Sequence, residues 1–302
     1  MTGATRHPIA NIRAYLLLTV TALCWGGNAV FGRLAVGEIS PMLLVTFRWL
    51  GVLLLISVFA NRYIRKDWPV LKRHLVFVAA MGTLGFTAFN ALFYVAAHST
   101  TAINIGIIQG SIPVFVIIGA YLAYRTPVTA LQAAGVLLTM VGVAVVASEG
   151  SIERLSGLSV SRGDALMVVA CLLYGGYAVG LAKRPLVSTL GFFTAISAAA
   201  LLASLPLVAA EAILGQLQWP TLTGWIVVVL VALLPSLLAQ IFFMRGIELI
   251  GPGRAGVFVN LVPVFASILA VLVLGESFEI HHAAALVCVL GGIWISEKGK
   301  PG

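Results

Sequence analysis

The stretch Ile112-Pro113-Val114-Phe115 returns as Val262-Pro263-Val264-Phe265, 150 positions further along a chain of 302 residues. Nearer the start of each copy, Trp25-Gly26-Gly27-Asn28-Ala29-Val30 corresponds to Tyr174-Gly175-Gly176-Tyr177-Ala178-Val179 at an offset of 149. Self-similarity at a fixed offset indicates that one structural unit occurs twice. The fold then depends on how many membrane spans each copy contains.

The composition indicates a membrane protein. Hydrophobic residues make up 61% of the chain and charged residues only 9%, whereas a soluble domain carries about a quarter charged residues. The net charge of +8 does not indicate a nucleic-acid partner, because the basic residues fall in loops and form no patch interleaved with aromatic residues. Cys24, Cys171 and Cys288 lie inside apolar runs without metal-ligand spacing, so we expect no metal site and no cofactor.

Ten stretches are long and apolar enough to cross a bilayer, which requires about 20 residues each. They are residues 13–32, 41–60, 74–96, 101–123, 128–147, 163–182, 187–210, 222–244, 253–274 and 280–296. The predicted fold is therefore an all-α integral membrane protein of ten helices, built as two inverted five-helix repeats. The predicted units are an N-terminal tail (1–12), a first repeat (13–148), a linker (149–162), a second repeat (163–297) and a C-terminal tail (298–302).

The distribution of Lys and Arg predicts the orientation. Fourteen of them fall on the side that holds both termini, three (Arg33, Arg154 and Arg162) fall on the other side, and Arg48 lies within the second span. Positive residues collect on the cytoplasmic side, so both termini are expected in the cytoplasm. Five spans per copy place the second copy in the membrane upside down. Inverted repeats are typical of secondary transporters, whose substrate site lies near mid-bilayer between the repeats.

In its spans and motifs the chain resembles the EamA branch of the drug/metabolite transporter superfamily over residues 13–297. The resemblance rests on Trp25-Gly26-Gly27-Asn28, an Arg in the second span, the doubled Pro-Val-Phe motif, and Leu274-Gly275-Glu276 at the end of span nine. The first copy departs from the pattern, since Tyr124-Arg125 stands where the family often shows Gly-Glu.

Within the superfamily the chain looks most like the YddG-type exporters of aromatic and other neutral amino acids. This likeness implies an exporter of the bacterial inner membrane, with a central cavity between spans one, three, four, six, eight and nine. Its partners would be a small-molecule substrate and the lipid bilayer, with one transport unit per chain.

Polar side chains inside the spans are candidates for the substrate site, because they are costly in hydrocarbon unless they face a cavity or another helix. The predicted substrate-binding residues are Trp25, Asn28, Asn90, Tyr94, Gln109, Tyr174, Tyr177, Gln240 and Asn260. Amides and phenols can bind a zwitterion without a fixed charge, and rings can stack on an apolar side chain. The alternative for each residue is a hydrogen bond to a neighbouring helix.

Pro113, Pro235 and Pro263 lie inside spans and remove backbone donors, which predicts hinges for gating or, equally, static bends that improve packing. The glycine pairs that begin at Gly26 and Gly175 favour close helix packing. For Arg48 a structural role is favoured over substrate contact.

The sequence lacks the residues that ion-coupled transport, ATP hydrolysis and enzyme catalysis usually require. No Asp or Glu lies deep within a span, which argues for transport driven by the substrate's own gradient or by exchange. There is no phosphate-binding Gly-rich loop for ATP and no nucleophile or metal motif of a membrane enzyme. A pore-type channel and a membrane enzyme therefore remain weaker alternatives. Aromatic and large neutral amino acids are the first substrate hypothesis, with purines, nucleosides and amphipathic drugs left open.

Overall fold

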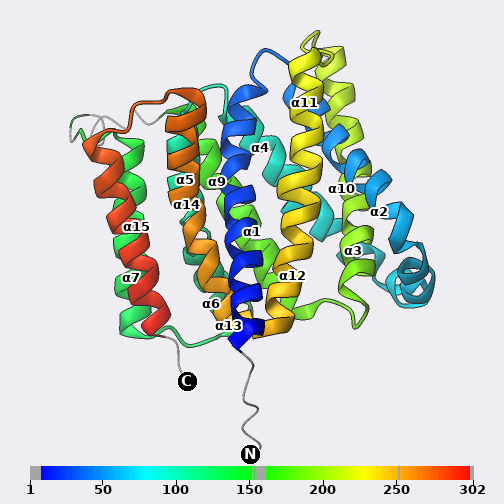
Figure 1. Cartoon of the computed structure of the whole chain (residues 1–302), viewed down its shortest axis with the longest axis horizontal. Coiled ribbons are helices and arrows are strands. Elements are labelled where there is room, and N and C mark those ends of the chain that lie inside the picture. Colours follow the sequence, from blue (N-terminus) through cyan, green and yellow to red (C-terminus); the bar gives the residue numbers. More distant parts are fainter. Residues whose placement is uncertain (1–7, 152, 154–160, 251, 300–302) are drawn as a thin grey trace, which may run out of the picture.

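The computed structural model describes residues 8–151, 153, 161–250 and 252–299, and every regular element in that part of the chain is helical. Helices satisfy their own backbone groups, as hydrocarbon requires. Figure 1 shows the helices standing side by side, with the start of the first helix and the end of the last at one face. We call this face the terminal face and the other the opposite face. Most of the predicted linker and tails falls outside the described residues.

The first half contains five spans, of which the third and fourth are interrupted. Its elements are α1 (Pro8–Leu34), α2 (Pro41–Leu71), a 3-10 turn (Lys72–His74), α3 (Leu75–Met81), a π-helical segment (Gly82–Ala88), α4 (Phe89–Ala96), α5 (Ala102–Gln109), α6 (Ile112–Tyr124) and α7 (Ala130–Ala147). The sequence predicts one continuous span at each of these positions, with a hinge or bend at Pro113 in the fourth. The structure shows instead that the helical hydrogen bonding changes at the cavity described below, because a π segment and a proline lie there.

The second half repeats this plan in the opposite direction. Its elements are α9 (Arg162–Gly180), a 3-10 turn (Leu181–Lys183), α10 (Thr189–Ile213), α11 (Leu222–Val231), a π-helical segment (Ala232–Leu238), α12 (Ala239–Ile250), α13 (Pro252–Val257), a 3-10 turn (Phe258–Leu261), α14 (Val262–Leu269), a π-helical segment (Ala270–Leu274) and α15 (Ile280–Lys298). Within the described residues, nine helices are long and apolar enough to cross a membrane, and the shorter apolar helix Pro41–Ser57 supplies the tenth span. The predicted fold, ten helices in two inverted halves, is confirmed.

The two π-helical segments that interrupt the third and eighth spans obey the repeat. Gly82–Ala88 and Ala232–Leu238 lie 150 positions apart and are equally long. Each is followed by an amide side chain at the same offset, Asn90 in the first half and Gln240 in the second. A π segment inserts an extra residue into the helix and turns the following residues to a new direction. The direction of both amide side chains is therefore set by the same irregularity of the backbone, a π-helical segment that ends two residues earlier.

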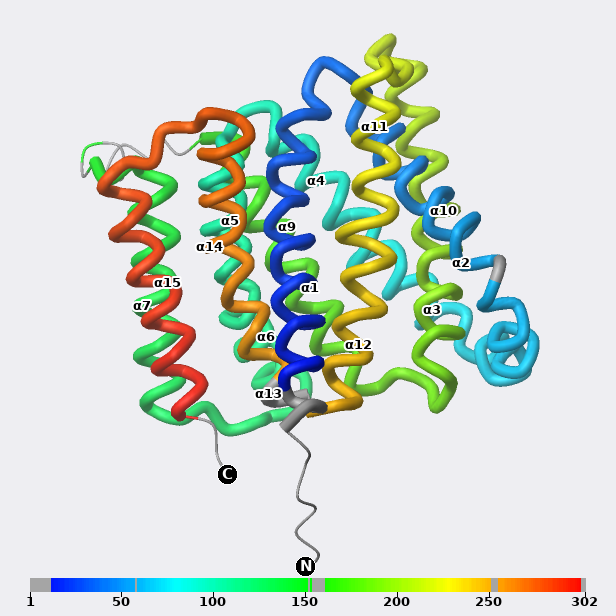
Figure 2. Tube along the Cα trace, viewed as in Figure 1, coloured from blue at the N-terminus to red at the C-terminus, as the bar shows by residue number. Residues whose placement is uncertain are grey.

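Small residues bring the halves into backbone contact. A Cβ on Gly26 of α1 would lie 2.9 Å from the Cβ of Phe265 in α14, and a Cβ on Gly175 of α9 would lie 2.6 Å from the Cβ of Phe115 in α6. Each glycine belongs to one half and each phenylalanine to the other. The predicted close packing at these two glycines is therefore observed across the repeat boundary, on both sides of the pseudo-two-fold axis. Figure 2 shows α1 between α14 and α12 of the second half.

The outermost helices α7 and α15 also pack through glycines. A Cβ on Gly142 would lie 2.8 Å from the carbonyl oxygen of Ala285, and the symmetry-related Gly292 would place its Cβ 2.5 Å from the carbonyl oxygen of Gly135. Such approach is possible only without side chains, as in other closely packed membrane helices. In Figure 1 this pair stands at one edge of the molecule, and α2 with α10 stands at the other.

Buried carboxylates cap the helices of the second edge reciprocally. Asp67, in the last turns of α2, accepts a hydrogen bond from the backbone N–H of Ser188 (3.0 Å) at the start of α10. Glu211, in the last turn of α10, accepts one from the backbone N–H of Met42 (3.0 Å) at the start of α2. Both carboxylates thus serve the unpaired amides of a helix N-terminus and hold the antiparallel pair in register.

Candidate functional site

A cavity of about 420 Å³ lies between the two halves and is bordered by α1, α2, α4 to α6, α9, α10 and α12 to α15 together with the π segments. Its polar lining residues are Asn28, Arg48, Asn90, Gln109, Tyr174, Ser236, Gln240, Asn260, Ser296 and Glu297. Its aromatic lining residues are Trp25, Trp49, Phe86, Phe89, Tyr174 and Phe193. A concave, mostly apolar space with a few polar groups is the usual form of a small-molecule site.

The cavity extends to the terminal face but not to the opposite face. Gly256 near the end of the short helix α13, and Ser296 and Glu297 in the last turn of α15, belong to its wall toward the terminal face. Toward the opposite face the lining ends at the level of Asn28 and Arg48. The cavity wall therefore runs from the level of Asn28 and Arg48 to residues near the terminal face.

Seven of the nine predicted substrate-binding residues line this cavity. They are Trp25, Asn28, Asn90, Gln109, Tyr174, Gln240 and Asn260. The structure therefore brings together amides from α1, α4, α5, α12 and the turn between α13 and α14, which are far apart in the sequence. Their contact with a substrate remains a prediction.

Tyr94 and Tyr177 are not among the cavity-lining residues. The hydroxyl of Tyr94 accepts a hydrogen bond from Nη1 of Arg48 (2.6 Å) and its side chain is buried behind the wall. The ring of Tyr177 packs against Phe86 (centroids 5.4 Å apart) and Tyr174 (5.3 Å). Helix periodicity places both tyrosines on inward faces, but it does not distinguish the first layer of side chains from the second. Both support the lining residues from behind.

Arg48 is the residue that the sequence analysis undervalued. It lies in α2 with only 6% of its surface exposed, and its Nη1 donates to Oδ1 of Asn28 (2.9 Å) as well as to Tyr94. It also lines the cavity, so it can face a solute while it keeps its hydrogen bonds to Asn28 and Tyr94. The available signal was a lone arginine about two turns inside an apolar helix, since a charge at that depth normally has a function.

Aromatic rings form the apolar wall. Trp49 and Phe86 stack in parallel with centroids 4.4 Å apart and an interplanar angle of 3°. Phe89 lies against Tyr174 with centroids 5.0 Å apart. Trp25 is fixed by a hydrogen bond from Nε1 to the carbonyl oxygen of Pro235 (3.0 Å). Rings held in this way offer a rigid surface on which an aromatic or apolar group can stack.

All three predicted hinge prolines border the cavity and stand at helix interruptions. Pro113 is the second residue of α6, just after the break at Gly110, and Pro263 is the second residue of α14, just after the 3-10 turn. Pro235 lies inside the π segment Ala232–Leu238. A proline cannot donate to the preceding turn, which explains why the regular hydrogen bonding stops there. Movement about these points remains a prediction.

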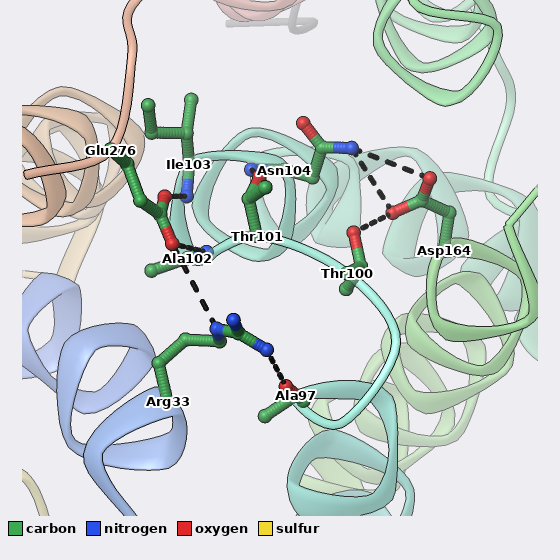
Figure 3. A network of polar contacts seen from close by, with 9 residues as sticks. All are labelled: Arg33, Ala97, Thr100, Thr101, Ala102, Ile103, Asn104, Asp164 and Glu276. Atoms are coloured by element: carbon green, nitrogen blue, oxygen red, sulfur yellow. Dashed lines mark hydrogen bonds and ion pairs between the residues drawn. The ribbon is translucent and has the colours of Figure 1, made fainter. Parts of the chain in front are cut away.

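Polar bonds tie the helices together at the opposite face (Figure 3). The carboxylate of Glu276, which follows α14, accepts hydrogen bonds from the backbone N–H groups of Ala102 (2.8 Å) and Ile103 (3.0 Å) at the start of α5. Nε of Arg33 in α1 lies 3.9 Å from Glu276, and its Nη1 donates to the carbonyl oxygen of Ala97 (2.5 Å). One carboxylate thus joins α1, α5 and the end of the ninth span.

A second buried carboxylate extends the same network. Asp164, in the first turn of α9, accepts a hydrogen bond from the hydroxyl of Thr100 (2.5 Å) and lies 3.4 Å from Nδ2 of Asn104. Asp164 is only 2% exposed although it is close to the helix end. This position near the helix end agrees with the prediction that no acidic residue lies deep within a span. Asp164 is nevertheless enclosed by protein, and it links α9 to α5.

The terminal face lacks the residue that would form the symmetry-related tie. Gly275 ends the ninth span in the left-handed conformation (φ 67°), and Arg125 ends the fourth span in the same conformation (φ 55°). The residue after Gly275 is Glu276, whereas the residue after Arg125 is Thr126. The departure of Tyr124-Arg125 from the family pattern therefore has a structural consequence. Glu276 ties the helices together at the opposite face, whereas Thr126, at the corresponding position of the terminal face, has no carboxylate with which to do so.

An inverted repeat of five-helix units around a cavity is the architecture of many membrane transporters. The chain belongs to the EamA-like transporter family, which it matches over residues 12–148 and again over residues 161–297. The chain is thus a multi-pass membrane protein of a transporter family.

Relatives of similar length support this assignment. The chain is 27% identical to the uncharacterized transporter YyaM of Bacillus subtilis (strain 168), over 94% of this chain and 93% of that protein. It is 28% identical to the uncharacterized transporter YetK of the same organism, over 95% and 88% of the two chains. A solved crystal structure shares the fold with a TM-score of 0.62 at 15% identity, covering 93% of this chain and 95% of its own.

Proposed function

We propose that the protein exports aromatic and other neutral amino acids, or similar small metabolites, across the bacterial inner membrane by alternating access. The observation that carries this proposal is the aromatic-walled cavity between the halves, which reaches the terminal face while Glu276 ties the opposite face. A carrier needs a site that communicates with one side at a time, and this arrangement is one of the two required states.

The direction of transport follows from the charge distribution. The excess of Lys and Arg on the loops of the terminal face supports a cytoplasmic terminal face, so the cavity opens to the cytoplasm. An exporter loads its substrate from that side. Export then requires the tie at Glu276 to break while the helices around the terminal mouth close.

The lining chemistry supports the substrate class. The amide side chains of Asn90, Gln109 and Gln240 make part of the wall polar, and the stacked Trp49 and Phe86 rings offer a flat apolar surface. The volume of about 420 Å³ suits a molecule of amino-acid size, since small-molecule pockets run from about 300 to 1,000 Å³. The only carboxylate among the cavity-lining residues is Glu297, at the mouth, which favours a carrier driven by the substrate gradient or by exchange.

Transport by the purified protein in liposomes tests the proposal. A panel of labelled phenylalanine, tryptophan, leucine, adenosine and glutamate is presented with and without proton and sodium gradients. We expect saturable uptake and counterflow of the aromatic and large neutral amino acids that no ion gradient drives uphill. Selective transport of adenosine would show that the proposed amino-acid substrate class is wrong. Current without counterflow would indicate a pore. Uptake by liposomes reconstituted so dilutely that each holds at most one copy tests whether a single chain is the transport unit.

A further inference from the structure

Arg48 occupies the deep end of the cavity, where it carries a positive charge away from water. It follows Pro41, the start of α2, by seven residues, which places it about 10 Å along the helix from the opposite face. Its side chain is more than nine-tenths buried, and part of the cavity wall is made by it. The guanidinium side chain carries a positive charge.

No carboxylate of the described residues lies within ion-pair distance of Arg48. Glu297, the one carboxylate in the cavity wall, is in the last turn of α15 at the terminal face, at the other end of the cavity. Buried charges in proteins are normally paired, because an isolated ion loses its hydration without compensation. The deep end of the cavity therefore has an unbalanced positive charge.

The neighbours of Arg48 fix its guanidinium but do not neutralise it. Asn28 and Tyr94 both accept hydrogen bonds from Nη1, and the Tyr94 hydroxyl lies 3.4 Å from Oδ1 of Asn28. Both described hydrogen bonds leave from this single nitrogen. Nε of Arg48 and Nε1 of the adjacent Trp49 are buried and have no hydrogen-bond partner among the described residues. Neither nitrogen is itself exposed to the cavity space, but a buried donor without a partner is costly, so their hydrogen-bonding capacity near the deep end of the cavity is unsatisfied.

We propose that Arg48 binds the carboxylate of the substrate, so that the cavity selects aromatic or apolar organic carboxylates and does not require their ammonium group. The guanidinium is planar and presents its donors in the geometry that a carboxylate accepts. A monoanion neutralises the deep end of the cavity, whereas a zwitterion brings an ammonium that leaves the positive charge in place. The stacked rings of Trp49 and Phe86 then hold the apolar body of the substrate. This inference rests on the proposed transport of aromatic metabolites.

A set of four related compounds tests the inference on the unaltered protein in nanodiscs, with binding measured by calorimetry. The set comprises 3-phenylpropanoate, phenylalanine, 3-phenylpropanamide and phenylalaninamide. We expect 3-phenylpropanoate to bind at least as tightly as phenylalanine, and both amides to bind at least about tenfold more weakly, as the loss of a charged hydrogen bond implies. Amides that bind as tightly as the acids would overturn the role of Arg48 and leave the proposed function intact. If none of the four binds, the proposed substrate class itself is wrong, and the inference is withdrawn with it.

Substitution of Arg48 provides an independent measurement. Arg48→Gln should reduce affinity for 3-phenylpropanoate at least about tenfold while affinity for the amide changes little, so that discrimination between acid and amide is lost. Arg48→Lys keeps the charge and should retain part of the discrimination. Arg62→Gln, an exposed arginine further along α2, is the matched control and should bind all four compounds as the unaltered protein does. Unchanged discrimination in a folded Arg48→Gln variant would refute the proposal.

Discussion

The backbone of Gly26 lies against Phe265, with no room for a side chain between them. A Cβ at position 26 would lie 2.9 Å from the Cβ of Phe265 and 2.8 Å from the backbone nitrogen of Ala266. Gly175 meets Phe115 in the same way across the pseudo-two-fold axis. One glycine from each half is therefore pressed onto the Pro-Val-Phe segment of the other half, and these two contacts fix the distance between the repeats at the level of the cavity.

Gly26→Ala and Gly175→Ala should each destabilise the protein by about 1–3 kcal/mol, because backbone atoms of the partner helix must move to admit a methyl group. The second glycine of the latter pair is the matched control, since a Cβ on Gly176 would meet no atom within 4 Å. Thermal unfolding in detergent, followed by tryptophan fluorescence, measures the difference. Equal melting temperatures for the Gly175→Ala and Gly176→Ala variants would contradict the packing described.

Asn90→Ala and Gln240→Ala should reduce transport of aromatic amino acids about tenfold with little change in melting temperature. Both amides line the cavity at equivalent positions of the two halves, and removal of a polar contact to the substrate typically costs about 1 kcal/mol or more. Initial uptake rates in liposomes, corrected for the amount of inserted protein, provide the measurement. Asn61→Ala removes an exposed amide of α2 and serves as the control. Normal transport by both cavity variants would place the substrate elsewhere.

Tyr177→Ala should behave differently from these two variants. Tyr177 packs behind the wall against Phe86 and Tyr174, so its loss leaves a void that costs about 3–5 kcal/mol and lets the wall rearrange. We expect a lower melting temperature together with impaired transport, whereas Tyr177→Phe should preserve both. A stable Tyr177→Ala variant with selective loss of transport would instead indicate direct contact with the substrate.

Glu276→Gln should loosen the opposite face. The carboxylate accepts hydrogen bonds from the amides of Ala102 and Ile103, and an uncharged amide side chain can reproduce only part of this cap. Hydrogen–deuterium exchange of the peptide that covers the start of α5 should become faster, because local opening exposes these amides. Glu248→Gln, which removes an exposed ion pair with Arg245, should leave that peptide unchanged. Unaltered exchange in the Glu276 variant would show that the carboxylate does not hold this face.

His98, in the loop between α4 and α5, should make stability depend on pH. Burial, together with the nearby positive charge of Arg33, lowers the pKa of His98 below its ordinary 6.5, although Glu211 acts in the opposite direction. The unfolded chain then binds a proton more readily than the folded one, so stability is complete above about pH 6.5 and is lost as the pH falls. Melting temperatures between pH 8 and 5 should fall less steeply for His98→Gln. Parallel curves would contradict this contribution.

The sequence predicts the large-scale architecture well, because lipid leaves few alternatives. Apolar runs long enough to cross the bilayer, the charge bias and the offset between Pro113 and Pro263 together imply ten helices in two inverted halves. The structure confirms this fold. Selection of amides in spans one, three, four, eight and nine also found five of the ten polar lining residues of the cavity, because few other places tolerate an amide at that depth.

Finer features escape the sequence for physical reasons. Pro235 marks the π segment Ala232–Leu238, whereas the π segment Gly82–Ala88 contains no proline and lies in an ordinary apolar run, so no residue type in the sequence indicates it. Tyr94 and Tyr177 share the inward helix faces with true lining residues, so only the neighbouring helices decide which of them is covered. For Arg48 the sequence favours a structural role, because an arginine at that depth can extend to the interface or bond carbonyls between helices, whereas the lack of a carboxylate beside it is visible only in three dimensions.

The unequal ends of the fourth and ninth spans have a consequence for energetics. Glu276 closes the opposite face with charged hydrogen bonds, while Thr126 occupies the corresponding position at the terminal face. The two end states of the transport cycle are therefore not mirror images in free energy, although the scaffold that connects them is nearly symmetric. We expect the empty carrier to return spontaneously to the state that faces the terminal side. Each transport cycle would then begin from the same state, the one that faces the terminal side.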